Sequence, residues 1–417
     1  MLIALPRGRA VRPVVHEGWG ARRTLESVRF PHLPRRSVLL GVVLAPFGVA
    51  ACSQQDKPVA PAPPRTTSTT TAPPPKPRVT GAGLPADLLG TMTALYLGGK
   101  VPASGAVAAA LAKRTPVKAP PKVVGSTGSW KGTPVASVAT GKDLTLLVKG
   151  SNGWTVVGGW WPGLKVGRPA MKPMRVLAIG SDARSGQPVT KCRADALHII
   201  GVDPTKGVGG IVGIPRDSWV ALSSGGSGKV NSALVFGGVT GMVHTVSRAT
   251  GVPIDGYVIT GFKGFRGMIG ALGGIVVVSK SSLQSVDGFR IVKPGTNRLD
   301  AKHALAFARE RKHLSNGDFG RSANQGVLIR SGVAMAQRLG PGQLARLLSK
   351  MGPHLATDLS VTEVLNISAS LYLSPAAKIA NKVAPGGVGT RAGQSVVLLG
   401  GGARSLFADM RNGRLGA

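Results

Sequence analysis

The sequence contains few acidic residues, with 17 Asp and Glu against 52 Lys and Arg in 417 residues, which gives a formal net charge of +35. A surplus of this size indicates an anionic partner, which can be nucleic acid, a phospholipid surface or an anionic polymer. The charge alone does not choose among these three. The compartment in which the protein works has to be inferred from the N-terminal residues.

The N-terminal region lacks an apolar run of the roughly 20 residues that a membrane-spanning helix needs. Its apolar run, SVLLGVVLAPFGVAA at residues 37–51, is shorter and directly follows Arg35 and Arg36. This length is typical of a signal-peptide core, and the paired arginines resemble a twin-arginine export signal. The run ends in VAACS, which resembles a lipobox with Cys52 as its cysteine.

We therefore expect residues 1–52 to be an export segment of the lipoprotein type, with Cys52 lipidated and residues 1–51 removed. The alternative is an uncleaved anchor helix at residues 37–51. Both interpretations place the protein on the extracytoplasmic face of the cell membrane, lipid-anchored or held by a single N-terminal helix. Without residues 1–51 the chain keeps 44 basic and 15 acidic residues, a net charge of +29. Anionic envelope polymers or phospholipid headgroups are then favoured as partners, and no nucleic acid is expected.

Cysteine is also scarce, since Cys52 and Cys192 are the two present. Lipidation of Cys52 leaves Cys192 without a partner, which excludes a structural disulfide. Cys192 lies beside Arg193 in the sequence, and we expect it to be an unreactive small residue rather than a redox group.

A chain of 417 residues is too long for one ordinary domain, so two folded units plus tails are expected. Residues 53–80 are rich in Pro and Thr and indicate an extended linker. Residues 81–167 predict a small α+β accessory module, in which helical spacing of apolar residues is followed by short strands. Four tryptophans of this module are predicted to be core residues, with a sugar-stacking surface as the alternative: Trp130, Trp154, Trp160 and Trp161.

Residues 174–417 alternate between predicted strands and helices, which indicates an α/β domain with a mixed β-sheet flanked by helices on both sides. Apolar runs predict strands at residues 175–180, 196–202 and 208–214, and a late strand at 395–399 that returns to the sheet. Asp300 is expected to cap a helix over residues 301–311.

Polar residues fall at the ends of the first three strands of this domain. Asp182 and Arg184 follow the first strand, Arg193 and Asp195 open the second, and Arg216 follows the third. Sites form at the carboxyl ends of strands in open α/β sheets. An antiparallel second strand that starts at the same edge would bring Asp195 beside Asp182. Because two neighbouring carboxylates repel each other, a hard divalent cation such as Mg²⁺ is the expected occupant.

A second polar cluster lies in and after the helix predicted at residues 301–311. It contains Arg309, Arg311, Arg321 and Gln325. Arginine side chains bind phosphate oxygens in a bidentate manner, and several together suit a pyrophosphate. A single arginine is ordinarily a solvated residue or one half of an ion pair, but several at element ends together with two aspartates favour phosphoryl transfer.

These residues lie in strings that resemble the LytR-CpsA-Psr family of cell-wall phosphotransferases over Met174–Asp409. The strings are GSDAR, RAD, GIPRDSWV, GKVNSALVFGG, GVPIDGYVITGFKGF, ALGGIVV and LDAKHALAFARERKHLSNGDFGRSANQ. Their order and spacing together are specific, although each string is short. The sequence departs from the family pattern at Ala194, Ala196 and Asn324, where Ser, Thr and Arg are usual. None of these departures removes a charge that the mechanism needs.

The resemblance implies transfer of a phospho-glycopolymer from a polyprenyl-pyrophosphate carrier to a peptidoglycan acceptor, assisted by Mg²⁺ or Mn²⁺. It gives the metal-binding role to Asp182 and Asp195. The same two aspartates and five arginines form the predicted catalytic set: Arg193, Arg216, Arg309, Arg311 and Arg321. Pyrophosphate binding is expected from these five arginines together with Arg184 and Gln325. Which polymer is transferred is not indicated, although the composition suits a high-GC Gram-positive, actinobacterial source.

A polyprenyl chain needs an apolar tunnel, and several residues lie on segments that are expected to line one. They are Phe236, Phe262, Phe265, Met268 and Ile269, and the alternative for each is an ordinary core position. Two other functions are alternatives to this one. One is a pyrophosphatase that acts on the lipid-linked substrate with water as acceptor, and the other is a non-catalytic protein that binds wall polymers through the tryptophan-bearing module and the basic surface.

Overall fold

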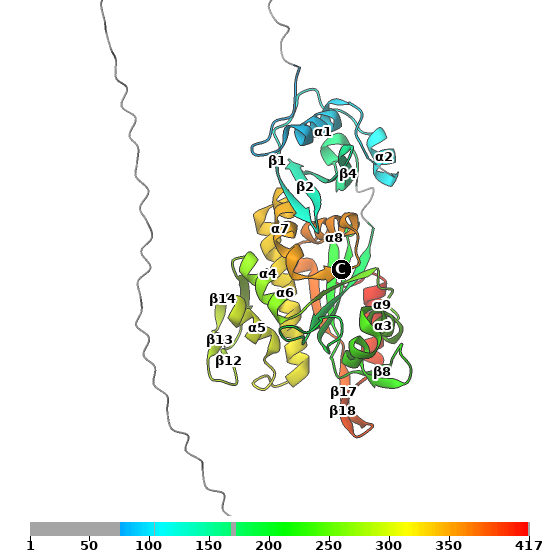
Figure 1. Cartoon of the computed structure of the whole chain (residues 1–417), viewed down its shortest axis with the longest axis vertical. Helices are drawn as coiled ribbons and strands as arrows, with labels where there is room; N and C mark the ends of the chain where they lie inside the picture. The colour runs from blue at the N-terminus through cyan, green and yellow to red at the C-terminus, as the bar shows by residue number, and fades with distance from the viewer. Residues whose placement is uncertain (1–75, 104, 168–171, 416–417) are drawn as a thin grey trace, which may run out of the picture. The chain divides into compact units, whose positions relative to one another are not determined.

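The structure is a computed structural model that describes residues 76–103, 105–167 and 172–415 (Figure 1). These described residues belong to one compact unit. The predicted export segment, Cys52 and the linker up to residue 75 lie outside the described residues. Within the described ranges, no helix combines the length and the apolar character needed to cross a membrane.

The accessory module is an antiparallel four-stranded sheet with two helices. The sheet has the order β1-β2-β3-β4, and its elements are α1 (Ala86–Leu97), α2 (Gly105–Ala112), β1 (Val124–Trp130), β2 (Thr133–Thr140), β3 (Asp143–Gly150), β4 (Gly153–Trp160) and the 3₁₀ turn η1 (Pro162–Leu164). Its four tryptophans are between 0% and 8% exposed. They are therefore core residues, and the alternative of a sugar-stacking surface is wrong because no indole face is open to solvent.

The module begins slightly earlier than predicted. Val79 is 1% exposed, and its backbone N–H donates to Thr93 Oγ1 at 3.0 Å. The carbonyl of Thr80 accepts from Val123 N at 2.8 Å. Residues 79 and 80, assigned to the linker from their composition, are thus tied to the module by burial and by backbone pairing.

A six-stranded mixed sheet forms the centre of the second domain. Its order is β15-β10-β5-β6-β7-β16, from β5 (Met174–Ser181), β6 (Ala194–Asp203), β7 (Val208–Gly213), β10 (Gly256–Thr260), β15 (Ala356–Thr357) and β16 (Ile379–Val383). Strand β6 is antiparallel to both β5 and β7, whereas β10 is parallel to β5 and β16 is parallel to β7. The tight β6–β7 turn follows from Asp203, whose carboxylate accepts from Thr205 N at 3.0 Å, and from Gly207, which has a φ of 66°.

Helices cover both faces of this sheet, as predicted. One face packs on α3 (Ala233–Thr250) and α9 (Gly401–Arg411), and the opposite face is covered by α4 (Phe262–Ala271), α5 (Ala301–Arg309), α6 (Gly317–Leu339), α7 (Leu344–Met351) and α8 (Val361–Leu373) (Figure 1). Short elements lie outside the sheet: β8 (Trp219–Ala221), β9 (Ser227–Lys229), η2 (Val230–Ser232), β11 (Ile275–Ser279), β12 (Leu283–Gln284), β13 (Arg290–Val292), β14 (Gly295–Leu299), η3 (Pro341–Gln343), η4 (Gly352–His354), η5 (Ala376–Lys378), β17 (Gly386–Arg391) and β18 (Gln394–Leu399).

The late strand predicted at residues 395–399 does not join the main sheet. It is β18, which forms a separate antiparallel hairpin with β17 and also makes an isolated bridge between Val397 and Ser218. The sixth strand of the sheet is instead β16, a segment for which the sequence patterns above predict no strand. Asp300 caps α5 as expected, since its carboxylate accepts from His303 N at 2.8 Å, but the helix ends at Arg309 because Glu310 has an extended backbone.

Candidate active site

A β-bulge at the start of β6 determines where the Asp195 side chain points. Ser181 pairs with Ala194 and Gly180 pairs with Ala196, so Asp195 is an extra residue in the ladder. Side chains alternate along a strand, and a regular β6 would turn Asp195 to the same face as Leu197, which lies in the α3/α9 core. The bulge releases it from this alternation, and Asp195 lines a cavity on the opposite face together with Ala196 and His198.

The second predicted metal ligand, Asp182, follows β5 directly. Its backbone N–H donates to the carbonyl of Arg193 at 2.9 Å, so the β5–β6 pairing continues past the bulge. The antiparallel arrangement of β5 and β6 is the one expected from the sequence, and it places Asp182 and Asp195 at the same edge of the sheet. Both side chains are only partly buried, and thus accessible to a ligand.

Arg216 is surrounded by carboxylates. Its Nη1 lies 2.6 Å from Asp195 Oδ1, and its Nε lies 3.7 Å from Asp318 Oδ1 and 3.8 Å from Asp217 Oδ2. Burial by itself would lower the pKa of the Arg216 guanidinium, but these carboxylates outweigh it and raise the pKa. Arg216 is therefore a fixed cation in a partly buried ion-pair network.

Arg321 belongs to the same network. Its Nη2 lies 2.6 Å from Asp318 Oδ1 and donates to the carbonyl of Asp195 at 3.3 Å. The residue is 6% exposed, and this burial lowers its pKa. The Nε atoms of Arg216 and Arg321 are buried without a hydrogen-bond acceptor within the described part of the chain. Buried donors of this kind indicate a site that is completed by an anionic ligand.

Arg309 and Arg184 both lie over the Phe262 ring. The Arg309 Cζ atom is 4.8 Å from the ring centroid, and the Arg184 Cζ atom is 6.0 Å from it. Both side chains are exposed, and no carboxylate of the described residues forms an ion pair with either. Phe262 thus holds two cations at the rim of the cavity while leaving their N–H groups open to a ligand.

The remaining predicted site residues differ in position. Gln325 lines the cavity, and its side-chain nitrogen donates to the carbonyl of Ala308 at 2.9 Å. Arg193 and Arg311 are exposed and are not among the residues that line the cavity. Arg311 nevertheless lies near enough to Arg321 for its charge to lower the pKa of Arg321, after the larger effect of burial.

The cavity has a volume of about 390 Å³ and lies between the sheet and helices α4 to α8. Charged groups are confined to one end, where Asp195, Arg309 and Arg321 lie. The rest of the lining is mainly apolar, and four of the predicted lipid-binding residues belong to it: Phe262, Phe265, Met268 and Ile269. An apolar cavity that ends in cations suits an amphipathic ligand with an anionic head.

The fifth predicted lipid-binding residue, Phe236, is not at this cavity. It lies in the first turn of α3 and is 69% exposed, and α3 covers the other face of the sheet. The adjacent Ala233 and Leu234 face the core, which turns Phe236 to solvent. The prediction for Phe236 is therefore wrong, because the face of α3 that it occupies could not be read from its local sequence.

Three residues contribute to the site although they were not predicted to do so. Asp318 links Arg216 to Arg321, and its signal in the sequence is the i, i+3 spacing to Arg321. Glu310 accepts from the backbone N–H groups of residues 311–313 at 2.8–3.1 Å and so orders the loop after Arg309. Burial would raise the Glu310 pKa, but these hydrogen bonds lower it.

The third residue is His198, on the floor of the cavity. Its side chain is 1% exposed, and Nε2 lies 3.0 Å from the carbonyl of Ser322. Burial lowers the pKa of His198 to about 4, although the hydrogen bond opposes this shift. His198 is therefore a neutral polar group in the lining at physiological pH.

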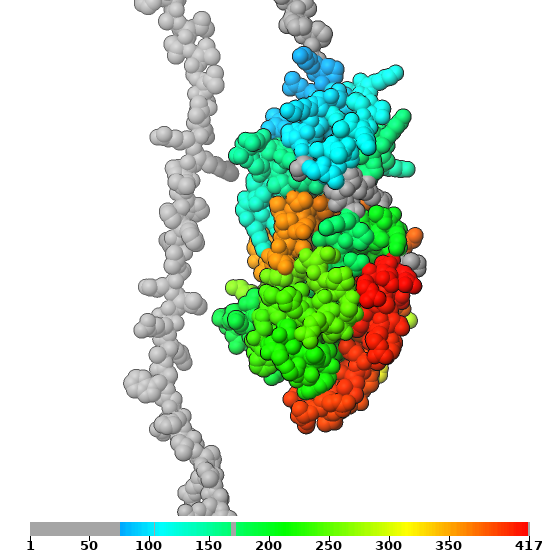
Figure 2. Space-filling view, turned by 90° about the vertical axis from the view of Figure 1, so that its right-hand side faces the viewer, coloured from blue at the N-terminus to red at the C-terminus, as the bar shows by residue number. Residues whose placement is uncertain are grey.

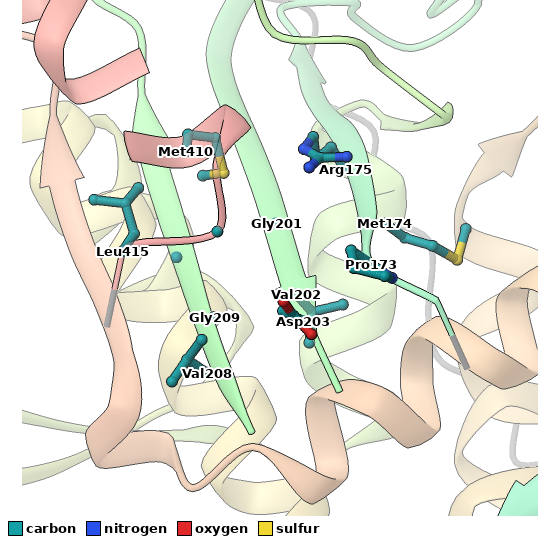
Figure 3. Close-up of a pocket in the computed structure, with 12 residues that line it drawn as sticks. Pro173, Met174, Arg175, Gly201, Val202, Asp203, Val208, Gly209, Met410 and Leu415 are labelled. Atoms are coloured by element: carbon teal, nitrogen blue, oxygen red, sulfur yellow. The ribbon is translucent and has the colours of Figure 1, made fainter. Parts of the chain in front are cut away.

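A much smaller cavity, of about 20 Å³, lies at the other end of β6 (Figure 3). Two glycines of the sheet are covered closely there. A Cβ atom added at Gly201 would lie 2.4 Å from Met410 Sδ, and one added at Gly210 would lie 2.7 Å from Leu415 Cβ. The nearby Asp203 carboxylate is already engaged by Thr205 and Lys206. This cavity has room for about one water molecule and is a packing detail rather than a site.

Comparison with solved structures supports the fold. Protein gbs0355 from Streptococcus agalactiae matches with a TM-score of 0.51 and 20% sequence identity, over 58% of this chain and 87% of that chain. Among curated proteins, the chain is similar to a protein of Bacillus cereus (strain AH820) named polyisoprenyl-teichoic acid–peptidoglycan teichoic acid transferase TagU. The two are 34% identical over 202 residues, and the match covers 47% of this chain and 64% of that protein. The protein of the same name from Bacillus subtilis (strain 168) is 38% identical over 158 residues, covering 38% of this chain and 50% of its own length.

The chain thus spans less than two thirds of the length of these two relatives. The model of the LytR_cpsA_psr family matches residues 164–401, which include the bulge at Asp195, the arginine network and the elements that enclose the cavity. The accessory module lies almost entirely before this match. Because the match covers more than half of the chain, the protein belongs to the LytR_cpsA_psr family.

Proposed function

We propose that this protein is an extracytoplasmic phosphotransferase that moves a phospho-glycopolymer from a polyprenyl-pyrophosphate carrier to peptidoglycan. The observation that carries the proposal is the shape of the cavity, which is apolar along its length and ends at Asp195, Arg309 and Arg321. A polyprenyl tail fits the apolar part, and the pyrophosphate fits the charged end. The names of the Bacillus relatives, which describe transfer of polyisoprenyl-linked teichoic acid to peptidoglycan, support the same substrate class.

In the proposed reaction a hydroxyl oxygen of the wall acceptor attacks the phosphorus that carries the glycopolymer. A new P–O bond forms while the anhydride P–O bond breaks, and polyprenyl phosphate leaves with the electron pair of the broken bond. The acceptor releases its hydroxyl proton. Negative charge grows on the leaving phosphate, and the nearby Arg216, Arg309 and Arg321 stabilise this charge.

Arg216 and Arg309 have different tasks in this proposal. Arg216 is oriented by carboxylates, and a charge held in place before the reaction needs no reorganisation in the transition state. Arg309 has its guanidinium over Phe262 and its N–H groups available, which suits direct contact with a phosphate oxygen. Arg184 lies over the same Phe262 ring and adds a second cation to this rim.

The donor set fits a Mg²⁺ or Mn²⁺ ion that is completed by the substrate. No cluster of three or more His, Cys, Asp or Glu side chains able to hold a metal occurs in residues 76–103, 105–167 and 172–415. Asp182 and Asp195 alone would hold the ion, and Mg²⁺ commonly uses one or two carboxylates together with substrate phosphates and water. When bound, such an ion neutralises charge on the pyrophosphate.

The export segment and the basic surface support the proposed location. The apolar run at residues 37–51 and Cys52 favour a membrane anchor, and a net charge of +29 beyond residue 51 favours anionic polymers and lipid headgroups. Such an anchor keeps the protein near a lipid-linked substrate.

A product assay tests the proposal. The full-length protein is incubated with a lipid-linked phospho-glycopolymer, peptidoglycan and Mg²⁺, and the products are separated into polymer bound covalently to peptidoglycan and free phosphorylated polymer. We expect bound polymer, together with one polyprenyl phosphate for each polymer transferred. Free phosphorylated polymer in the presence of peptidoglycan would instead identify a pyrophosphatase. Binding of wall polymer without turnover would reject both enzymes, although burial of the module's tryptophans leaves only the basic surface to support that third function.

A further inference from the structure

Helix α7 has no N-terminal cap of its own. The residue before it, Gln343, makes no side-chain capping hydrogen bond. The first N–H groups of an α-helix have no partner within the helix, and a side-chain oxygen usually accepts from the second or third of them. In α7 these two groups belong to Ala345 and Arg346.

Two serines of the accessory module supply the missing acceptors. The Oγ atom of Ser137 accepts from Ala345 N at 3.0 Å, and the Oγ atom of Ser126 accepts from Arg346 N at 3.3 Å. Both hydroxyls also donate to the carbonyl of Gly342, from Ser137 at 3.0 Å and from Ser126 at 2.6 Å. Ser126 on β1 and Ser137 on β2 are direct cross-strand partners and are 3% and 0% exposed. We call them the serine pair.

The backbones of the module and α7 are in direct contact around the serine pair. A Cβ atom at Gly128 of β1 would lie 2.5 Å from the carbonyl oxygen of Ala345. A Cβ atom at Gly342 would lie 3.0 Å from the carbonyl oxygen of Val124. Figure 2 shows the orange residues of this helical region against the blue-green strands of the module. The module and α7 therefore form one packed layer, with no space for a larger side chain between them.

The other side of α7 lines the cavity. Leu344, Leu347, Leu348 and Met351 all contribute to its wall, and Leu344 and Leu348 also pack into the core that contains Trp130 of the module. The part of this wall that is distant from Arg321 is the Leu344 end of α7. The cavity follows α6 from Arg321 to Ala336, which is about 22 Å along a helix, and α7 begins shortly after α6 ends.

We propose that the accessory module sets the far end of the lipid cavity and thereby determines the affinity for long polyprenyl tails. The serine pair acts as a positioning device in this inference, which rests on the proposed lipid-linked substrate. By capping α7 from outside, it fixes the wall against which the distal part of a long tail packs. A short tail that ends before α7 does not reach this wall, so its binding does not depend on the serine pair.

The test compares a short and a long lipid in the full-length protein. Binding of farnesyl phosphate and of undecaprenyl phosphate is measured for the wild type and for the double variant Ser126→Ala/Ser137→Ala. Ser129→Ala is the matched control, because Ser129 is on the same strand but is exposed. We expect the double variant to bind the long lipid about tenfold more weakly, since lost caps weaken a helix substantially. Its affinity for the short lipid should match that of the control.

Other outcomes separate the two proposals. Equal weakening for both lipids, or no change for either, would overturn the role of the module while leaving the proposed function intact. A wild type that binds neither lipid would overturn the lipid-linked substrate and this inference with it. If the double variant does not fold, the single variant Ser126→Ala keeps Ser137 on Ala345 and is measured in the same way, with about threefold weakening expected for the long lipid alone.

Discussion

Arg216 and Arg309 show how ion pairing and exposure give two arginines of this site different roles. Arg216 contacts Asp195, Asp217 and Asp318, so its position is determined before any ligand binds. Arg309 stacks on Phe262 and has no carboxylate partner in the described part of the chain. A fixed guanidinium and an available one together provide both orientation and direct phosphate contact.

We expect Arg216→Lys and Arg309→Lys each to reduce turnover severely, by about 30- to 1000-fold. Lysine keeps the charge but loses the planar fork that contacts two oxygens at once. The loss should appear in kcat for polymer transfer rather than in lipid binding, because the tail supplies most of that affinity. Arg330→Lys is the control, since Arg330 is exposed on α6 and does not line the cavity. Near-native turnover in both site variants would show that the arginines supply only a general positive potential and make no specific contact with the pyrophosphate.

The two aspartates at the sheet edge are expected to be needed for metal-dependent turnover. Asp182→Ala and Asp195→Ala should each abolish the Mg²⁺-dependent rate, because one carboxylate cannot replace two in a site otherwise completed by phosphate. Both residues lie at strand ends rather than in the core, so the circular dichroism spectrum should be unchanged. A titration of the rate with Mg²⁺ checks this, with Asp287→Ala as an exposed control. Full activity in either site variant would remove the metal assignment.

His198 predicts a loss of stability in mild acid. Its pKa is lowered from 6.5 to about 4 by burial, so between these values the unfolded chain binds a proton that the folded chain does not. Stability therefore falls as the pH drops through this window, by about 2 kcal/mol between pH 7 and pH 5. Urea unfolding at the two pH values should show this decrease in the wild type and a smaller one in His198→Gln, which keeps a side-chain N–H for Ser322. The exposed His244→Gln is the control and should behave like the wild type.

Among the elements, helix α6 combines two tasks. Its N-terminal turn contributes Arg321 to the ion-pair network, and its later turns line the apolar part of the cavity. The lining includes Gly332, where an added Cβ atom would have no neighbour within 4 Å. A glycine in mid-helix costs stability, and at this position it leaves space in the cavity.

Gly332→Leu should therefore weaken lipid binding without destabilising the protein. The leucine side chain enters the space that we assign to the polyprenyl tail, while the better helix former adds up to about 1 kcal/mol of stability. We expect at least tenfold weaker binding of undecaprenyl phosphate, with an unchanged or higher unfolding midpoint. Gly270→Leu, at an exposed α4 position that also has space around it, is the matched control. Unaltered lipid binding in Gly332→Leu would show that the tail does not occupy this part of the cavity.

At the scale of the whole molecule, the strong positive charge and the proposed anchor act together. The chain beyond residue 51 keeps a net charge of +29, which attracts anionic headgroups and polymers over the distance of a Debye length. An anchor at residue 52 would hold this charge near the membrane through the Pro/Thr-rich linker. The effects of the surface charge and of the anchor can be separated experimentally, because salt screens the electrostatic attraction to the membrane but does not remove a lipid anchor.

We expect Cys52→Ala to release the protein from the membrane fraction, since the lipidated residue would be lost. The measurement is the distribution of the protein between membrane and soluble fractions at high salt, where attraction of basic residues to headgroups is screened. Cys192→Ala, which removes the other cysteine, should leave the distribution unchanged. Full membrane retention of Cys52→Ala at high salt would favour an uncleaved helix at residues 37–51.

Much of the architecture is predictable from local sequence, because apolar periodicity, turn residues and helix caps act over a few positions. The buried strands β5 and β6, the cap at Asp300 and the placement of aspartates and arginines at strand ends all follow from neighbours in the chain. The family motifs identify the same residues. Local pattern was insufficient for Phe236, for the strand at residues 395–399 and for the end of the linker, where the burial of a side chain or the choice of a pairing partner mattered.

The remaining features arise from contacts between segments that are distant in sequence. The bulge that turns Asp195 to the cavity depends on the register between β5 and β6, and Arg216 reaches Asp318 across about 100 residues. The hydroxyl of Ser126 meets Gly342 across 216 residues. Residue types at such positions restrict which contacts are chemically possible. Only the packed chain determines which of them form, because burial and hydrogen-bond geometry depend on all the neighbouring elements at once.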